Sequence, residues 1–254
     1  MTAKNHKNKE SQWFGFEKVA PQEKTRRVIG VFSSVAENYD LMNDLMSGGI
    51  HRLWKNKFIR MMRPQARKKL LDVAGGTGDI AFRYRKLAGE EAEITVFDLN
   101  PDMLKVGQNR AIDRGYLKGF EWVEGNAEKL PFADRSFDLY SISFGLRNVT
   151  HIDDALAEAY RVLKPGGQFF CLEFSNVDNP LLRKAYDAYS FGVIPKIGDL
   201  VAHDRDSYQY LAESIRQFPN RRALSRRLKN AGFEYVKAVP LTGGIAAIHT
   251  GTKI

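Results

Sequence analysis

The chain alternates short apolar runs with longer stretches of mixed polarity. Five apolar runs of strand length stand in its central part, and helices are predicted between them, at about 79–87, from Pro101 onward and over 153–163. Strands that alternate with helices favour an α/β fold with a parallel, doubly wound sheet. The predicted strands are Lys69–Ala74, Ile94–Asp98, Phe120–Glu124, Phe137–Ser143 and Gln168–Phe174.

The N-terminal part of the chain precedes this alternation. Its first ten residues are basic and polar and contain no apolar segment of the kind found in secretory signals. We interpret residues 1–24 as a flexible basic tail and residues 25–254 as a single domain. A helical pattern over residues 23–63 is broken at Ser47–Gly49 and ended by Pro64.

The alternation stops again towards the C-terminus. Residues 179–218 are predicted to form a long, mainly helical insert, and a further helix is expected over 221–231. The apolar segments Tyr235–Leu241 and Ile245–Thr252 then flank Thr242-Gly243-Gly244. This pattern is a hairpin signal, which predicts that the sheet closes with antiparallel strands.

A glycine cluster follows the first predicted strand. Glycine lets the backbone turn sharply and approach a ligand closely. The next strand ends on Asp98, 22 residues after Gly76, and such a carboxylate can accept hydrogen bonds from both hydroxyls of a ribose. Residues 76–81 fit the dinucleotide pattern G-x-G-x-x-G/A. Residues 72–78 equally resemble the S-adenosylmethionine (SAM) signature of class I methyltransferases, with Ala74 in place of its first glycine.

Later segments favour the SAM alternative over an NAD-dependent oxidoreductase. They resemble the later class I methyltransferase motifs in order and spacing, and the terminal hairpin suits that fold. The resemblance implies a Rossmann-like seven-stranded sheet of six parallel strands and an antiparallel strand 7 between strands 5 and 6, with N-terminal helices and a helical lid insert. The segments are Gly125–Phe132, Ser136–Asp138 and Arg161–Gly167.

The same resemblance implies a set of SAM-binding residues. The glycine cluster would cradle the methionine part, Asp98 would hold the ribose, and Asn126 with Ala127 would border the adenine. A simpler alternative for Asn126 is a turn residue. The expected cofactor-binding residues are Gly76, Thr77, Gly78, Asp98, Asn126, Ala127 and Ser143.

Longer motifs indicate one family within the class I methyltransferases. From about residue 25 to the C-terminus the chain closely resembles the ubiquinone/menaquinone biosynthesis C-methyltransferases, the UbiE group. That resemblance implies C-methylation of a polyprenylated benzoquinol, 2-methoxy-6-polyprenyl-1,4-benzoquinol, or of demethylmenaquinol. A methyltransferase for another small hydrophobic aromatic substrate is the alternative. The motifs lie in residues 31–55, 143–149, 185–191 and 206–215.

The resemblance and the chemistry of a ring carbon point to three catalytic candidates. A phenolate donates charge to its ortho carbon, and a permanently cationic Arg147 after the fourth strand could stabilise it. Asn148 could orient the quinol oxygen, and Tyr39 could close the pocket. The structural alternatives are a surface salt bridge for Arg147 and simple packing for Tyr39. For the proton that the ring carbon loses, His51, Asp40 and water are weak candidates.

Charge and composition add constraints on partners. The net charge of +9 permits contact with nucleic acid or anionic lipid, but no nucleic-acid motif is found and we expect no such partner. We interpret the basic residues between Arg221 and Lys229 as a solvated helix face, and a contact with a membrane surface is the alternative. Cys171 is predicted to be a buried, unreactive thiol, and no metal-ligand spacing is present, so no metal is expected.

No apolar run is long enough to span a membrane, so the protein is expected to be cytoplasmic and to visit the inner-membrane surface transiently. A homodimer and other quinone-biosynthesis enzymes stay open as partners. Aromatic residues in the insert could form a lid for an isoprenoid tail or ordinary core. They are Tyr186, Tyr189 and Phe191, with Val193, Ile194, Ile197 and Leu200 beside them.

Overall fold

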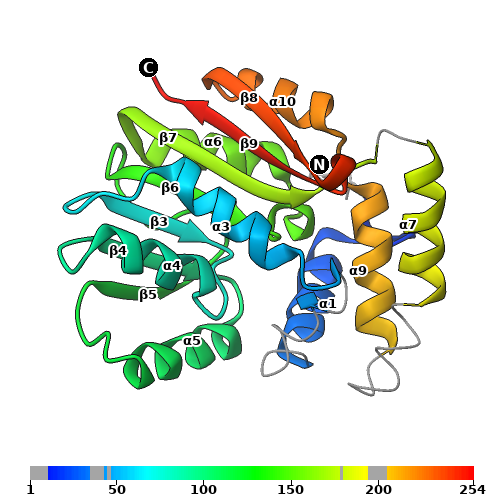
Figure 1. Cartoon of the computed structure of the whole chain (residues 1–254), viewed down its shortest axis with the longest axis horizontal. Helices are drawn as coiled ribbons and strands as arrows, with labels where there is room; N and C mark the ends of the chain where they lie inside the picture. Colours follow the sequence, from blue (N-terminus) through cyan, green and yellow to red (C-terminus); the bar gives the residue numbers. More distant parts are fainter. Residues whose placement is uncertain (1–10, 35–42, 45–46, 178–179, 194–204) are drawn as a thin grey trace, which may run out of the picture.

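A seven-stranded sheet forms the centre of the molecule (Figure 1). The computed structural model of the chain describes residues 11–34, 43–44, 47–177, 180–193 and 205–254. Along the sheet the strands run in the order β5-β4-β3-β6-β7-β9-β8. Their bounds are β3 Lys69–Val73, β4 Glu93–Asp98, β5 Phe120–Glu124, β6 Phe137–Ser143, β7 Leu163–Phe174, β8 Glu234–Leu241 and β9 Ala246–Thr252.

The direction of the strands confirms the expected fold. Strands β3 to β7 pair in parallel, whereas β9 is antiparallel to both β7 and β8 and lies between them. The hairpin predicted around Thr242-Gly243-Gly244 is therefore present, and a short 3₁₀ turn, η2 (Thr242–Gly244), connects its strands. Gly243 and Gly244 both adopt positive φ angles there, which glycine tolerates without strain.

Helices cover both faces of the sheet because neighbouring residues on each strand point to opposite sides. Leu70 packs with Phe58 on the side of α3 and α4, and Leu71 packs with Leu156 on the side of α6 and α10. Figure 1 shows α3 and α4 in front of the sheet and α6 behind it. The helix bounds are α1 Pro21–Ser34, α3 His51–Met62, α4 Asp79–Ala88, α5 Pro101–Asp113, α6 Ile152–Val162, α7 Pro180–Gly192, α9 Arg205–Gln217 and α10 Arg221–Asn230.

Strand β7 starts five residues earlier than predicted. We expected the strand to begin at Gln168, after a helix over 153–163, but Leu163 already pairs with Phe137, and the register shifts between Phe137 and Leu139. The backbone N–H of Gly166 donates to Lys253 O at 2.7 Å, and Lys253 N–H donates to Gly167 O at 2.9 Å. A bulged strand can carry Pro and Gly, so these residues mark an irregularity here and not an end.

The N-terminal boundary also differs from the prediction. Strands β1 (Gln12–Phe14) and β2 (Glu17–Val19) form a small antiparallel hairpin, and α1 follows it directly. The rings of Phe14 and Tyr210 stack with centroids 4.1 Å apart, so the hairpin packs against α9. The predicted flexible tail is therefore wrong for residues 12–24, while residues 1–10 lie outside the described part. Strands of three residues are too short for a period of two to reveal them.

The insert is helical in its described part, as expected. Its helices α7 and α9 contact each other and stand at the right of Figure 1. Tyr186 is buried, whereas Phe191 and Val193 are exposed, so the insert contributes both core and surface. The other apolar positions named for a lid, Ile194, Ile197 and Leu200, lie outside the described residues. Among the described helices, none combines the length and the apolar character that crossing a membrane requires.

Candidate active site

A cavity that is partly open to solvent lies at the carboxyl ends of β3, β4 and β6. Open α/β sheets bind ligands at this edge. Helix α1 provides the opposite wall with Val28, Ile29 and Phe32. The structure thus brings seven of the predicted site residues to one cavity: Gly76, Thr77, Asp98, Asn126, Ala127, Ser143 and Asn148.

The glycine loop after β3 is closely surrounded and needs a left-handed backbone at Gly76. Gly76 has a φ of 50°, and a Cβ added to it would lie 2.9 Å from Met103 Cε. Gly78 precedes the first residue of α4 with a φ of 80°, and it stands behind the cavity wall rather than in it. Ala74 replaces the first glycine of the motif and also adopts a positive φ, of 50°. The departure from the motif therefore keeps the backbone conformation that the glycine would have.

Asp98 faces this loop from the end of β4. Its Oδ2 accepts the N–H of Gly76 at 2.8 Å, and its Oδ1 accepts the N–H of Asn100 at 2.9 Å. Burial raises the pKa of Asp98 to about 6, although both backbone N–H groups favour the ionised form. Each carboxylate oxygen keeps a second lone pair, so the group can still accept two ligand hydroxyls.

Asn126 and Ala127, after β5, also line the cavity. Asn126 Oδ1 accepts the N–H of Glu128 at 2.9 Å, which is the turn role considered as the simpler alternative. The amide also lines the cavity, so the two roles are compatible. Ser143, at the end of β6, has a buried Oγ without a hydrogen-bond partner in the described part of the chain. Such an atom is costly unless a ligand or water satisfies it.

Lys55 and Asp79 form a buried pair that the sequence did not reveal. Lys55 Nζ lies 2.8 Å from Asp79 Oδ2, and both residues line the cavity beside the glycine loop. Burial acts to raise the pKa of Asp79, but Lys55 and Arg83 outweigh it and hold that pKa at about 2. The Lys55 side chain is 4% exposed. A charge this deeply buried needs a partner, which only the folded chain identifies.

Arg147 lies behind the cavity rather than in its wall. The guanidinium donates to Glu173 Oε1 at 2.9 Å and to Phe144 O, and it stands 5.6 Å above the ring of Phe174. Both charged side chains of this pair are almost fully buried. The salt bridge considered as the alternative for Arg147 is therefore present, but it is buried, not on the surface. Nε of Arg147 has no hydrogen-bond partner within the described residues.

Asn148, next in the 3₁₀ turn η1 (Leu146–Asn148), does line the cavity. Its Oδ1 accepts the hydroxyl of Tyr210 at 3.0 Å. Tyr39 and Asp40 lie outside the described residues. His51 is buried, is not part of the cavity wall, and bonds through Nε2 to Asp44 Oδ1 at 2.8 Å. Burial and the nearby Lys55 lower the pKa of His51, which leaves it neutral at pH 7.

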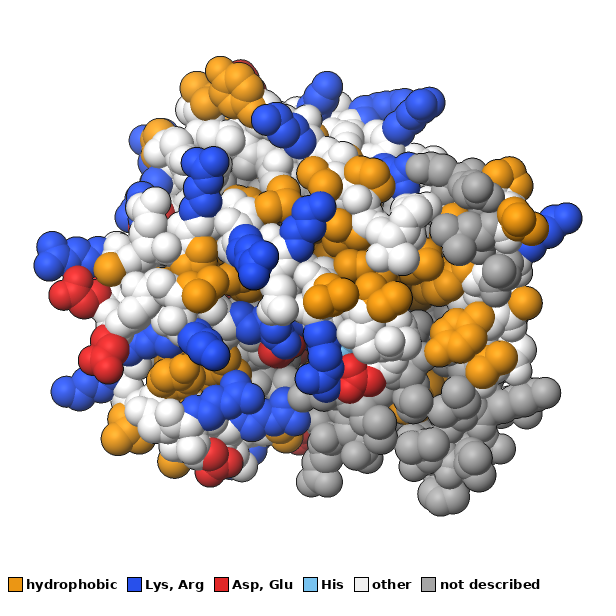
Figure 2. Space-filling view, viewed as in Figure 1, with side chains coloured by type: hydrophobic (Ala, Val, Ile, Leu, Met, Phe, Trp, Pro, Cys, Tyr) orange, Lys and Arg blue, Asp and Glu red, His pale blue; other side chains and the backbone are white. Residues whose placement is uncertain are grey.

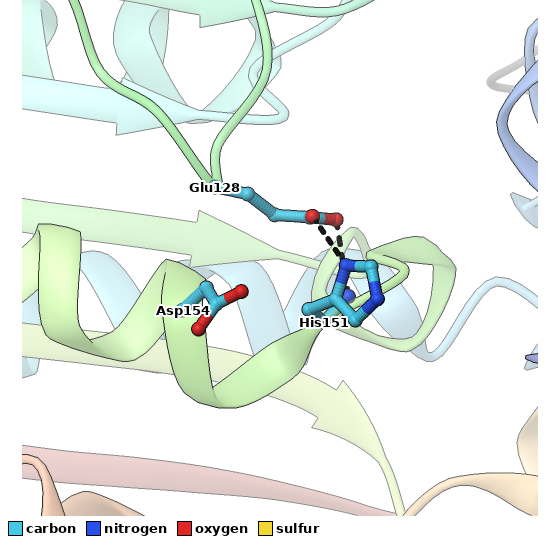
Figure 3. A group of neighbouring side chains, drawn as sticks. All are labelled: Glu128, His151 and Asp154. Carbon is cyan, nitrogen blue, oxygen red and sulfur yellow. Dashed lines mark hydrogen bonds and ion pairs between the residues drawn. The ribbon is translucent and has the colours of Figure 1, made fainter. Parts of the chain in front are cut away.

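Glu128, which lines the cavity, forms a group with His151 and Asp154 (Figure 3). Glu128 Oε2 bonds to His151 Nδ1 at 2.7 Å, and its Oε1 accepts the N–H groups of Thr150 and His151 at 3.0 Å each. Asp154, on the first turn of α6, completes a group whose ligand atoms lie within 4.8 Å of one another. No spacing in the sequence indicates this cluster, which could hold a metal ion. The hydrogen bonds already account for Glu128 as the group that fastens the start of α6.

Comparison with known proteins identifies the family. The profile described as "ubiE/COQ5 methyltransferase family" matches residues 20–253. The chain belongs to this family. It is a SAM-dependent methyltransferase, so the SAM interpretation of the glycine loop is confirmed over the NAD alternative.

The sequences of known relatives match this chain along most of their length. The chain is 54% identical to the "2-methoxy-6-polyprenyl-1,4-benzoquinol methylase, mitochondrial" of Oryza sativa subsp. japonica, over 95% of this chain and 88% of that protein. It is 55% identical to the "Ubiquinone/menaquinone biosynthesis C-methyltransferase UbiE" of Dinoroseobacter shibae, over 95% of this chain and 96% of that protein. Such identity over nearly the whole chain extends the resemblance well beyond the glycine loop.

Solved structures confirm the fold alone. A SAM-dependent methyltransferase from Aquifex aeolicus matches with a TM-score of 0.62 and 17% identity, over 87% of this chain and 98% of that one. Another SAM-dependent methyltransferase, from Thermotoga maritima, has a TM-score of 0.62 and 19% identity, over 89% of this chain and 99% of that one.

The residues present suit SAM, which carries a sulfonium cation. Three carboxylates surround the glycine loop: Asp72, Asp79 and Asp98. Asp72 Oδ2 is buried without a hydrogen-bond partner in the described part, as is the Ser143 hydroxyl. Burial raises the pKa of Asp72 to about 7, although a hydrogen bond from Ser141 favours its ionised form. A cationic ligand with hydroxyl and amino donors would relieve these groups.

We expect Lys55 to contact the carboxylate of SAM. Lys55→Met should weaken SAM binding by about 10-fold or more, because it removes a charge-assisted hydrogen bond. Binding of 5′-methylthioadenosine, which lacks the amino acid part, should change little. Titration calorimetry with both ligands measures the difference, and Lys57→Met, on an exposed turn of the same helix, is the control. An equal loss for both ligands would show that Lys55 only supports the loop.

Proposed function

We propose that the chain transfers the methyl group of SAM to a ring carbon of 2-methoxy-6-polyprenyl-1,4-benzoquinol, and that it also accepts demethylmenaquinol. The proposal rests chiefly on relatives that carry these substrates or pathways in their names and are 54–55% identical over 95% of the chain. The cavity supports it, because a polar, cofactor-binding end is combined with the apolar wall of α1 and the amide of Asn148.

The chemistry requires an ionised quinol. A phenol has a pKa near 10, like tyrosine, so a neutral quinol predominates at pH 7. Bound SAM supplies an electrophilic methyl group on a sulfonium sulfur. The ortho carbon would accept this methyl group, with S-adenosylhomocysteine as the leaving group, and would then release its proton to restore aromaticity.

We assign the stabilisation of the phenolate to η1. Asn148 can donate an N–H to the quinol oxygen from the cavity wall. Arg147 contributes a permanent positive charge in the same turn and acts through the loop or a water, since its guanidinium is bound to Glu173. Tyr39 is proposed to close the pocket. The base that takes the ring proton is left to Asp40 or water, because His51 is engaged with Asp44 away from the cavity wall.

The mass of the product tests this function. Purified protein is incubated with SAM and a short-chain 2-methoxy-6-prenyl-1,4-benzoquinol or demethylmenaquinol, each kept reduced. We expect a gain of one methyl group on the ring carbon of both. Methylation of an unrelated hydrophobic phenol with neither quinol reacting would favour the alternative of another small aromatic substrate.

We further propose that the protein visits the inner-membrane surface, where a polyprenyl substrate resides. Exposed apolar residues gather on the N-terminal hairpin and at the end of α7, where the rings of Phe16 and Phe191 lie 6.2 Å apart. Lys18 and Arg216 stand over neighbouring aromatic rings. Figure 2 shows further basic side chains scattered between apolar ones on one face of the molecule. Aromatic and basic residues together suit the interface of an anionic bilayer.

Flotation with liposomes tests the membrane proposal. Partial binding to anionic vesicles is expected, with a decrease as salt screens the basic residues. The double variant Phe16→Ser/Phe191→Ser should bind less. Leu117→Ser also replaces an exposed apolar side chain by serine, at a position after α5 that is 78% exposed, and it should leave binding unchanged. Binding that survives high salt and carbonate would contradict a peripheral mode. Nanomolar affinity for one nucleic acid at physiological salt would instead indicate a different partner.

A further inference from the structure

The amide of Asn148 is bonded to Tyr210 of α9 through its oxygen. Its Oδ1 accepts the hydroxyl of Tyr210 at 3.0 Å. Its Nδ2 donates to no group in the described part of the chain, and the residue lines the cavity. An amide turned by 180° would present its oxygen there, and an oxygen would repel a quinol anion. With Oδ1 bonded to Tyr210, the amide presents its donor end to the cavity.

Tyr210 is itself tightly placed. The side chain is 4% exposed, and burial raises its pKa, so the phenol stays protonated and remains a donor. Its ring stacks on Phe14 of the N-terminal hairpin at 4.1 Å and 16°. One turn further along α9, Glu213 Oε2 accepts the N–H of Phe16 at 3.1 Å. Two contacts from one face of α9 thus fasten the hairpin over Tyr210.

We propose that Tyr210 is a positioning residue that aims the N–H of Asn148 at the acceptor oxygen, and that Phe14 of the hairpin holds Tyr210 for this task. The inference rests on the proposed function, in which Asn148 donates to the quinol. It gives the N-terminal hairpin a part in turnover, although the hairpin contributes no group to the cofactor cavity.

The hydrogen bond from Tyr210 to Asn148 also changes the donor strength of the amide. Donation to Oδ1 polarises the amide, and chains of hydrogen bonds strengthen one another in a poorly solvated site. The N–H that faces the cavity becomes a better donor as a result. The benefit is largest when the quinol oxygen is anionic, so it should affect kcat more than the binding of either substrate.

A double-mutant cycle tests the proposal. Tyr210→Phe removes only the hydroxyl and leaves the ring on Phe14, and it should lower kcat about 3- to 10-fold, the range for one neutral hydrogen bond. The affinity for S-adenosylhomocysteine should stay within 2-fold. In an Asn148→Ala background the same substitution should have no further effect on kcat. Tyr235→Phe, which removes an exposed hydroxyl on β8, is the matched control.

Two further variants separate the parts of the argument. Asn148→Asp keeps an acceptor for Tyr210 but has no N–H, so it should lose kcat as Asn148→Ala does. Phe14→Ala should lower kcat in the wild type and have no added effect beside Tyr210→Phe. Assays use a short-chain, soluble benzoquinol, so that membrane contact plays no part.

Each result decides one statement. If Asn148→Ala leaves kcat unchanged, the catalytic assignment of Asn148 fails and the inference falls with it. If Asn148→Ala is slow but Tyr210→Phe is normal, or equally harmful in both backgrounds, the positioning role is overturned. If Tyr210→Phe lowers the affinity for S-adenosylhomocysteine as much as it lowers kcat, or if it clearly lowers the melting temperature, Tyr210 has a structural role only. A harmless Phe14→Ala would remove the hairpin from the proposal.

Discussion

Arg147→Ala is expected to lower kcat by about 100- to 1000-fold, as for the loss of an oxyanion donor. If Arg147 stabilises the phenolate, its effect is greater in the transition state than in the ground state, so affinity for SAM should change little. Arg147→Lys should recover only part of the rate, because an ammonium lacks the planar fork. Raising the pH should partly rescue Arg147→Ala by ionising more of the quinol. Steady-state kinetics at several pH values measure all three.

Because Arg147 is paired with the buried Glu173, the effect of Arg147→Ala on stability needs a control. Removing the guanidinium leaves the carboxyl of Glu173 alone at 1% exposure, which is expected to cost about 3–5 kcal/mol of folding stability if it stays charged. Arg147→Ala/Glu173→Gln should regain much of the melting temperature without regaining kcat. A double variant that recovers both, or an Arg147→Ala protein with a normal kcat per folded molecule, would restrict Arg147 to a structural role and move catalysis to Asn148 or Tyr39.

Asp98→Ala should weaken the binding of S-adenosylhomocysteine by about 10- to 150-fold. This corresponds to the loss of roughly 1.5–3 kcal/mol from hydrogen bonds to a charged acceptor. Gly76 would lose the acceptor of its N–H as well, so part of the effect comes from the loop. Titration calorimetry measures the affinity, and Asp102→Ala, at an acidic residue of the following helix, serves as the control.

The raised pKa of Asp98 adds a dependence on pH. Above a pH of about 6 the carboxylate is ionised and accepts both ribose hydroxyls. As the pH falls through 6 the group takes up a proton, so affinity should decrease, approaching 10-fold per pH unit. Asp72, with a pKa of about 7, titrates nearby, so the assignment needs a variant. Asp98→Asn should lack the step near pH 6, and a step that persists in this variant would assign it to Asp72.

The sheet and the cofactor end of the cavity were predictable because their signals are local. Strands β5 and β6 have the predicted bounds, since each is one apolar run between clear breaks. Gly76 and Asp98 belong to one β-α-β unit, so their separation along the chain already implies their contact. The same reasoning located Cys171, which is fully buried within β7.

Other parts depend on contacts that no local pattern contains. Glu173 stands within an apolar run, and only the fold shows that its charge meets Arg147. Lys55 and Asp79 belong to two helices that precede and follow β3 in the sequence, so their pairing was equally hidden. Tyr210 was noted as part of a motif, but its bond to Asn148 spans 62 residues. Long-range polar pairs are thus the part of this site that sequence reasoning missed.

The two ends of the site differ in how much of the chain must exist before they can form. Every residue in the wall of the cofactor cavity lies between Thr25 and Thr150. The hairpin, in contrast, is fastened to Glu213 across 197 residues, and Trp54 is bonded to Thr242 across 188. Closing such loops is slow and entropically costly. On a ribosome that adds about 5–20 residues per second, the cofactor walls would therefore be synthesised several seconds before the acceptor side could close. The chain would become competent for turnover only when its last strands arrive.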